Sequence, residues 1–321
     1  MGIDKSDESI LGILMNDADA TMDDIAKKLK LHKNTIALRI KKMEKEGIIQ
    51  GHFWCVDYMK FGIGTGIVFS LIVRNRPDIQ KALVQSVALI PQIESLVVKT
   101  GRYNVGGTMW TKNIDEAYSI LDKIRKDPIV LEVTFDMVTK IHKQRCNFNP
   151  FSSEVWQKEN HSGEIKQITD IDFGILEVLS QDAIPFTELA KNLGVSASKI
   201  KSRVRRMEQT GIILGKKVRV DPIKLGYNDF TMLRLKLCEK TDVGKVLSNL
   251  LRIPEIYDVR SVSGDYDLEL IFLSRGTMDT LRLLSRFTET EGILRGELEV
   301  AFIMLKGSDD YKPLQHYQDL R

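Results

Sequence analysis

The chain has 321 residues, of which 43% are hydrophobic, so it is long enough to bury more than one core. Its net charge is only +3, but residues 185–226 carry ten Lys and Arg against three Asp and Glu, and residues 21–60 carry nine against five. Because the rest of the chain is acidic, these two windows predict a local polyanion-binding surface rather than a generally basic protein.

The cysteines and the hydropathy exclude several classes of protein. Cys55, Cys146 and Cys238 lie far apart and form no C-x-x-C pattern, so we predict neither a disulfide nor a zinc site. A reduced, cytoplasmic compartment fits this usage. No apolar run is long enough to span a bilayer, so no membrane segment is expected.

Three short helices are predicted at the start of the chain. Apolar residues share one face over residues 7–16, and Thr21 with Asp24 is typical of a capping box that begins a second helix ending at Leu29. A tight turn then leads into a basic amphipathic helix within residues 32–51, whose apolar stripe is Ile36, Ile40 and Met43. This order predicts a helix-turn-helix.

A second copy of this pattern occupies residues 172–219. Its basic helix lies within residues 196–215 and has the apolar stripe Ile200, Val204 and Met207. Gly194 stands in the turn that Lys30 and Leu31 form in the first copy. Glycine adopts a left-handed turn without strain, whereas Lys30 has to adopt it with a Cβ. After each basic helix, β residues around a glycine predict a small hairpin, with its turn at Gln50-Gly51-His52 in the first copy. Each module is therefore expected to be winged.

Behind each wing, strands and helices are predicted in the order βαββαβ. In the first copy the strands lie near residues 67–71, 93–99, 105–110 and 131–137, and the same order returns in residues 230–305. This order usually builds a ferredoxin-like sandwich with helices on one face of a four-stranded sheet. The other sheet face has to be covered, and a second such sheet is the expected partner.

The predicted fold class is therefore α+β, with two repeats that each join a winged helix-turn-helix to a ferredoxin-like sandwich. The expected boundaries are a first winged module at 1–60, a first ferredoxin-like domain at 61–141, a linker at 142–168, a second winged module at 169–226, a second ferredoxin-like domain at 227–306 and a tail at 307–321. Phe148, Phe151 and Trp156 are unusual for a free linker, and we predict that they either pack against a neighbouring domain or act as local anchors.

These residues resemble a known family. The run from Glu188 to Tyr227 is similar to the DNA-binding half of the leucine-responsive regulatory protein/AsnC family, and Pro254 followed by Gly264-Asp-Tyr-Asp resembles its effector-binding half. The resemblance covers nearly the whole chain twice, whereas family members usually carry one copy. It implies a transcription regulator that binds double-stranded DNA, responds to a small effector such as an amino acid, and associates with itself through its ferredoxin-like domains.

The basic helices and the second wing supply the DNA-binding candidates. Residues near the start of such a helix reach base edges, and cations along it reach phosphates or brace the helix. The candidates for base contact are Lys33, Asn34, Thr35 and Leu38 in the first module, and Ala197, Ser198, Lys199 and Ser202 in the second. The candidates for phosphate contact or bracing are Arg39, Lys42, Arg203 and Arg206, with Lys216, Lys217 and Arg219 in the second wing. Two unequal modules predict an asymmetric pair of half-sites.

Two turns are the effector-binding candidates that the resemblance implies. The second repeat keeps Gly264, Asp265, Tyr266 and Asp267, whereas the first has Gly101, Arg102, Tyr103 and Asn104. The first turn replaces two carboxylates by a cation and an amide, so it is expected to bind an anion or nothing. Each turn is equally well interpreted as a strand connection with a packed tyrosine.

Two other functions stay open. Siroheme decarboxylases resemble the same family, but all five histidines, namely His32, His52, His142, His161 and His316, fall in the winged modules, the linker or the tail. An effector sensor without DNA binding would need weaker basic helices. We expect no enzyme activity, no cofactor and no metal, because no catalytic constellation stands out.

Overall fold

The computed structural model describes residues 3–57, 60, 64–74, 78–144, 146, 148–152 and 168–307. They form two compact units, each assembled from both repeats. One contains residues 1–57, 145–228 and 252–255, here called the winged-helix unit, and the other contains residues 58–144, 229–251 and 256–321, here called the barrel unit. Trp156 and most of the predicted linker and tail lie outside the described residues. No helix in the described ranges combines the length and apolar character needed to cross a membrane.

The winged-helix unit contains two triplets of helices. The first is α1 (Lys5–Asn16), α2 (Met22–Leu29) and α3 (Lys33–Lys45), and the second is α6 (Asp170–Leu179), α7 (Phe186–Asn192) and α8 (Ala197–Gln209). The predicted capping box of α2 is present, because Thr21 accepts a hydrogen bond from the Asp24 amide and Asp24 accepts one from the Thr21 amide. The predicted apolar stripe of α3 is buried, with Ile36 at 0% exposure. The sequence pattern thus predicted both triplets correctly.

The turns before α3 and α8 show the predicted difference in backbone strain. Lys30 has φ +55° in the left-handed region, and no other non-glycine residue in the described chain has a positive φ. Gly194 occupies the equivalent turn with φ +64°. A side chain at this conformation is strained, so the first turn is the less favourable of the two.

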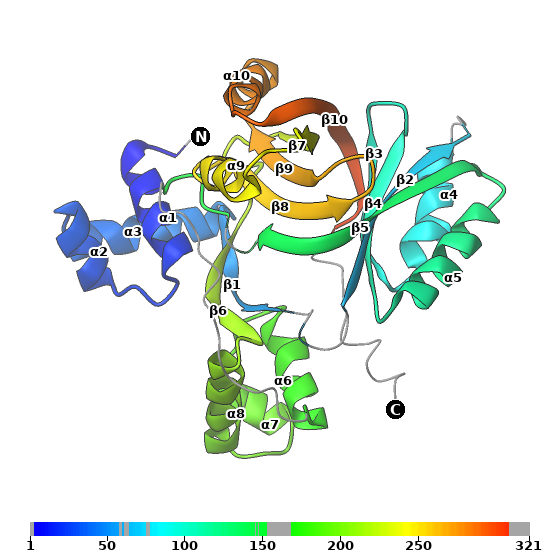
Figure 1. Ribbon diagram of the computed structural model, residues 1–321. Helices are drawn as coiled ribbons and strands as arrows, with labels where there is room; N and C mark the ends of the chain where they lie inside the picture. The colour runs from blue at the N-terminus through cyan, green and yellow to red at the C-terminus, as the bar shows by residue number, and fades with distance from the viewer. Residues whose placement is uncertain are drawn as a thin grey trace. The chain divides into compact units, whose positions relative to one another are not determined.

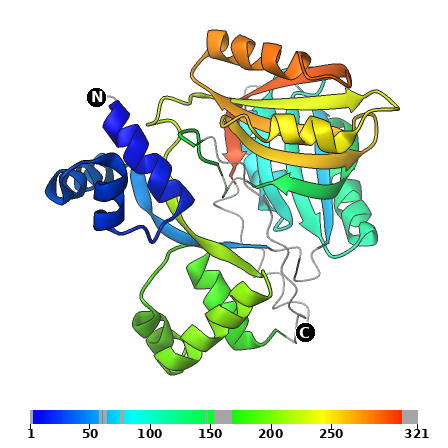
Figure 2. The same ribbon diagram turned by 60° about the vertical axis from the view of Figure 1, so that its left-hand side comes forward.

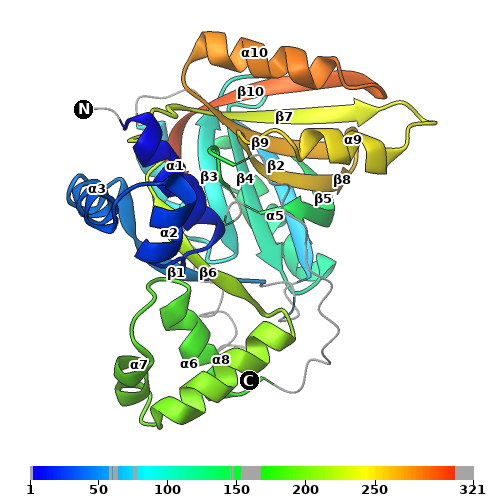
Figure 3. The same cartoon turned by 90° about the vertical axis from the view of Figure 1, so that its left-hand side faces the viewer.

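The wings differ from the predicted hairpins. Strand β1 (Ile49–Val56) of the first module pairs antiparallel with β6 (Ile213–Val220) of the second, with Ile49 opposite Val220 and Phe53 opposite Lys217. The predicted turn at Gly51 is instead a local irregularity at which the strand continues, with φ +119°. A long ladder between modules satisfies more backbone groups than two short local hairpins could. Figures 2 and 3 show the two helix triplets on either side of this pair.

Within the winged-helix unit, a short segment that follows the first barrel half packs onto α1. Asn149 donates hydrogen bonds to the Gly12 carbonyl (2.8 Å) and to Asn16 (2.7 Å) of α1, and Phe148 is buried against Tyr227. Phe148 of the predicted linker therefore packs within this unit, and Phe151 lies beside Gly12 of α1.

The same segment corrects the prediction that no disulfide forms. Cys55 of β1 and Cys146 are joined by one, although they lie 91 residues apart in sequence. Sequence spacing could not pair them, because the fold of the intervening chain brings them together. Cys238 is free and exposed.

The barrel unit is one closed sheet built from both repeats (Figure 1). The first repeat supplies β2 (Thr65–Val73), β3 (Ile93–Lys99), β4 (Val105–Thr111) and β5 (Val130–Lys143), and the second supplies β7 (Asp229–Leu237), β8 (Ile256–Ser263), β9 (Leu268–Ser274) and β10 (Ile293–Lys306). The strand order is β10-β3-β4-β2-β5-β8-β9-β7. The predicted sheet-on-sheet partner is therefore the other half of the same chain, joined at the β5–β8 and β3–β10 edges.

Helices cover the outer faces of the two halves (Figure 1). They are α4 (Ile79–Gln85), the 3-10 helix η2 (Val87–Leu89) and α5 (Ile114–Arg125) in the first half, and α9 (Val243–Leu250) and α10 (Thr277–Thr288) in the second. The core of the first half lies between sheet and helices, where Phe69, Leu83 and Leu121 are at 0% exposure. The βαββαβ order of both repeats is confirmed.

Along each strand, every second side chain packs into the core between sheet and helices, and the side chains between them point into the barrel. Many of the side chains that point into the barrel are charged. Lys99 forms an ion pair with Glu299 and donates to the Ser70 hydroxyl (3.1 Å), and Arg234 pairs with Glu299 at 3.0 Å. Burial lowers the pKa of the Lys99 ammonium, and the Glu299 carboxylate opposes this shift. Arg260, also buried, pairs with Asp258 at 2.6 Å. Ions of the two halves thus meet inside the barrel.

His142 lies in β5 rather than in the predicted linker. The strand continues to Lys143 because it pairs with β8 along this stretch, with Ile141 opposite Arg260. The half-buried His142 ring is 2.7 Å from the Ser261 hydroxyl. The prediction that no histidine belongs to a ferredoxin-like domain is therefore wrong.

We expect two substitutions at the equivalent turns to change stability in opposite directions. Gly194→Ala should lower the free energy of unfolding by about 1 kcal/mol, because a Cβ meets no atom within 4 Å there and only the left-handed backbone opposes it. Lys30→Gly should raise it by about 0.5 kcal/mol, since relief of strain exceeds the added chain entropy. Urea denaturation of both variants measures this, and shifts of the same sign would contradict the assignment of strain to Lys30.

Candidate nucleic-acid interface

The outward face of α8 consists of the side chains that are neither buried in the core of the module nor bonded to its other helices. Ile200, Val204 and Met207 are buried in the core. Ser198, Ser202, Arg205 and Gln209 lie on the opposite side at helical spacing and are exposed. We call this set the α8 outer stripe.

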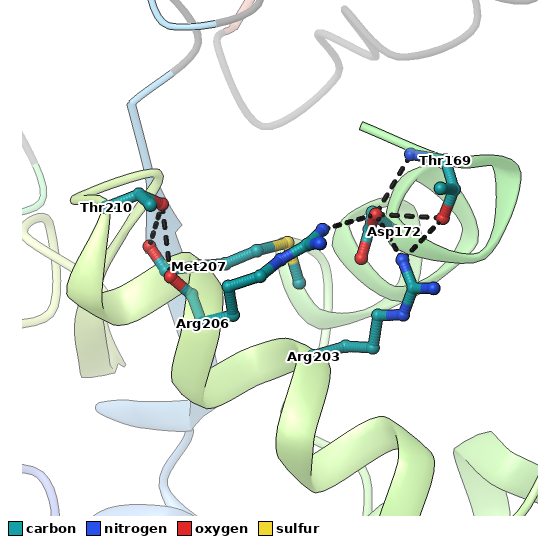
Figure 4. A network of polar contacts seen from close by, with 6 residues as sticks. All are labelled: Thr169, Asp172, Arg203, Arg206, Met207 and Thr210. Carbon is teal, nitrogen blue, oxygen red and sulfur yellow. Dashed lines mark hydrogen bonds and ion pairs between the residues drawn. The ribbon is translucent and has the colours of Figure 1, made fainter. Parts of the chain in front are cut away.

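Arg203 and Arg206 do not belong to the outer stripe. Both donate to the Asp172 carboxylate at 2.8 Å, and Asp172 is fully buried at the start of α6 (Figure 4). The same carboxylate accepts hydrogen bonds from the Thr169 amide (2.9 Å) and hydroxyl (2.8 Å), which completes a capping box. Of the two roles predicted for these arginines, this geometry supports bracing of α8 against α6.

The first module repeats this bracing with one arginine. Arg39 of α3 donates to Asp4 (2.7 Å) and Asp7 (2.8 Å), and these two residues form the capping box of α1. Lys42, the counterpart of Arg206, is exposed and makes no ion pair with the described residues. The α3 outer stripe, defined as Asn34, Leu38, Lys41 and Lys45, is exposed like that of α8.

The cations predicted for the second wing face the protein. Lys216 pairs with Asp19 at 2.9 Å, and the Arg219 guanidinium donates to the Gln181 carbonyl (2.8 Å) and stacks over Phe53. Burial lowers the pKa of the Lys217 ammonium. Because β6 lies in the sheet between the modules, Lys216 and Arg219 link the second module to Asp19 and Phe53 of the first, and this geometry does not support the predicted phosphate contacts.

The remaining predicted base-contact residues lie at the starts of the two helices. Lys33 and Thr35 are exposed, with Lys33 paired to exposed Asp23, and Lys199 is exposed while Ala197 is partly covered. Sequence reasoning missed four exposed cations, namely Lys41, Lys45, Lys201 and Arg205, none of which forms an ion pair with the described residues. Counting helical positions away from the buried stripe would have identified them.

The two predicted effector turns are largely occupied by their own contacts. In the first, Asn104 bonds both backbone groups of Val73, and Tyr103 donates to Glu132 at 2.8 Å. Arg102 pairs with the same carboxylate at 3.3 Å. Its glycine, Gly101, lies close to Glu299.

The second turn repeats this arrangement. Asp267 accepts from the Leu237 amide at 2.7 Å and from Lys236 at 3.0 Å, and Tyr266 donates to Glu297 at 2.9 Å. Asp265 is exposed, and Gly264 packs against Asp136, whose pKa is raised by burial. A turn-stabilising role is therefore evident at both places, and effector binding stays a prediction.

Comparisons with known proteins agree with the duplicated helix triplets. A sequence profile described as winged helix-turn-helix DNA-binding matches residues 3–50 and 168–213. The regulatory protein AsnC of Haemophilus influenzae is 39% identical over 104 residues, covering 32% of this chain and 69% of that protein. The HTH-type transcriptional regulator LrpA of Pyrococcus horikoshii is 35% identical over 122 residues, covering 37% of this chain and 84% of that protein.

The chain belongs to the Lrp/AsnC family. Each relative matches about one repeat, and the profile matches twice, so the chain is two family units in tandem.

A solved structure shares the fold of nearly the whole chain. The siroheme decarboxylase NirDL is similar in fold with a TM-score of 0.62 and 12% identity, covering 98% of this chain and 99% of that one. The same protein in complex with an iron-uroporphyrin III analogue gives a TM-score of 0.63.

Removing the carboxylate that braces α8 should destabilise this Lrp/AsnC protein. We expect Asp172→Ala to lower the free energy of unfolding by about 2–3 kcal/mol, because a charge-assisted hydrogen bond and a helix cap are lost together. Asp23→Ala is the matched control, since its ion pair with Lys33 is exposed and should contribute only about 0–0.5 kcal/mol. Urea denaturation measures both, and equal effects would show that the buried bracing contributes nothing beyond a surface pair.

Proposed function

We propose that this protein is a sequence-specific DNA-binding transcription regulator that uses both winged modules of one chain. The observation that carries the proposal is the pair of outer stripes on α3 and α8. They are exposed, and the cations Lys41, Lys45, Lys201 and Arg205 in them or beside them form no ion pair with the residues that the structure describes. Such a helix face can enter a major groove, with its cations along phosphates. The names of the Lrp/AsnC relatives support the same function.

The internal architecture gives this regulator an unequal pair of DNA-reading helices. The β1–β6 sheet links the modules through backbone hydrogen bonds, so both helices belong to one unit. Their outer stripes differ at every position, for example Leu38 against Ser202 and Lys45 against Gln209. We therefore propose an asymmetric pair of half-sites, and selection from a random DNA pool would contradict this by returning a symmetric site.

The exposed cations of α8 should contribute to DNA affinity, unlike cations elsewhere. We expect Lys201→Ala with Arg205→Ala to weaken binding at least about tenfold and to lower the slope of log affinity against log salt by about two, because two phosphate contacts are lost. The matched control is Lys123→Ala with Arg125→Ala on α5, which removes the same charges from exposed positions of the barrel unit. Fluorescence anisotropy over a salt series measures both, and an equal loss in the control would place the DNA interface elsewhere.

A small effector, such as an amino acid, is the proposed input to this regulator. Asp265 is the exposed carboxylate of the second turn. The hydrogen bonds that stabilise the turn are made by its neighbours Tyr266 and Asp267. Thermal shift measurements with individual amino acids, repeated with Asp265→Ala, test this. A stabilising ligand whose effect survives the substitution would place the effector site elsewhere.

A siroheme decarboxylase-like enzyme is the second candidate, because the fold of NirDL matches the whole chain and His142 lies in the barrel unit. A porphyrin with carboxylate groups is best held by cations that have no carboxylate partner. Lys99, Arg234 and Arg260 are instead all ion-paired with carboxylates of the barrel. We therefore favour the regulator. Spectral titration with iron-uroporphyrin III separates the two functions, since a saturable shift of the porphyrin band would support the enzyme.

A further inference from the structure

Leu38 is an exposed leucine on a strongly basic helix. Its side chain is 69% exposed, although the core of its module is already filled by Ile36, Ile40 and Met43 on the opposite side of α3. In the described part of the winged-helix unit, Ile223 is the other large apolar side chain with comparable exposure. The position of Leu38 is therefore not explained by packing within its module.

The neighbours of Leu38 indicate the kind of surface that it contacts. Asn34 lies one turn before it on the same stripe, and Lys41 and Lys45 follow it. An apolar protein partner would need a contiguous apolar patch, whereas this leucine stands alone among an amide and two ammonium groups. A single exposed leucine between lysines is better matched by an anionic surface that carries isolated apolar groups than by an apolar protein surface.

The major groove of DNA is such a surface. Thymine presents a 5-methyl group there, the only apolar group among the base edges, and adenine presents the donor and acceptor that an asparagine amide pairs with. A helix with Asn34 and Leu38 one turn apart can therefore contact an adenine and a thymine methyl while its lysines follow the phosphates.

We propose that Leu38 packs against the 5-methyl group of a thymine, so that the first module selects an A·T pair at that position. Ser202 occupies the equivalent position of α8 and has no apolar surface to offer. The second module is therefore indifferent to the methyl group at its corresponding base. This inference rests on the proposed DNA-binding function and adds the chemical feature that distinguishes the two half-sites.

The test uses the full chain and a duplex selected from a random pool. Each thymine is replaced in turn by uracil, which removes the methyl group and keeps the hydrogen-bonding edge. We expect one replacement in one half-site to weaken binding about fourfold, the value for one buried carbon group. With Leu38→Ala, binding to the thymine duplex should weaken, and thymine and uracil should then bind equally at that position.

Two controls make the outcome specific. Leu281→Ala, which removes another exposed leucine from α10 of the barrel unit, should leave the thymine-to-uracil difference unchanged. Leu38→Ala should keep the thermal midpoint of the parent protein, since the side chain is exposed.

The possible failures are distinguishable. If the pool yields no selected sequence, the proposed function fails. If a sequence is selected but no uracil replacement weakens binding, or the weakening persists with Leu38→Ala, the assignment of Leu38 is overturned while DNA binding stands.

Discussion

The pairing of strand edges between the two repeats is the constraint on which the rest of this protein depends. A strand edge carries unpaired amide and carbonyl groups, and these have to be satisfied by another strand or by solvent. The first ferredoxin-like half would end at β3 and β5, and β1 would have no partner in its own module. The second repeat supplies β10, β8 and β6 to these three strands. Duplication within one chain therefore closes the barrel and joins the two wings.

This constraint changes what the wing residues do. In a free hairpin, Lys216, Lys217 and Arg219 would extend toward a ligand. Here β6 is paired with β1 along its length, so Lys216 contacts Asp19 and Arg219 contacts Gln181 and Phe53, while Lys217 is partly buried. In the proposed function, DNA is read by the outer faces of α3 and α8, and the sheet between the modules supplies structure.

Local features were the part of the fold that sequence could predict. The Thr21 cap, the strained Lys30 turn and the strand alternation depend on neighbouring residues, and each is present in the structure. Features that depend on distant pairing could not be predicted. The glycine at position 51 indicates that the backbone can turn there, but it does not indicate which strand pairs with β1. The Cys55–Cys146 disulfide depends on how the chain folds between two residues that lie 91 apart in sequence.

The candidate site shows the same division. The i, i+3, i+4 spacing correctly separated the buried stripe of α8 from its polar residues. It could not tell which polar residues face α6, because this is decided by the buried Asp172 of another helix. The spacing therefore left both phosphate contact and bracing open for Arg203 and Arg206, and Lys201 and Arg205 were missed.

The charged interior of the barrel determines which halves pair. Lys99 of the first half meets Glu299 of the second, and Arg260 of the second donates to Thr108 of the first at 3.1 Å. Buried ion pairs contribute little net stability, because desolvation offsets their attraction, but a buried charge without its partner is costly. Separating the halves would leave the buried Lys99 and Glu299 without each other, so the pairing of these two halves is favoured. Charge alone would equally allow the unlike half of another molecule. Connection through one chain raises the local concentration of the correct half, and this favours the closed barrel within a single chain.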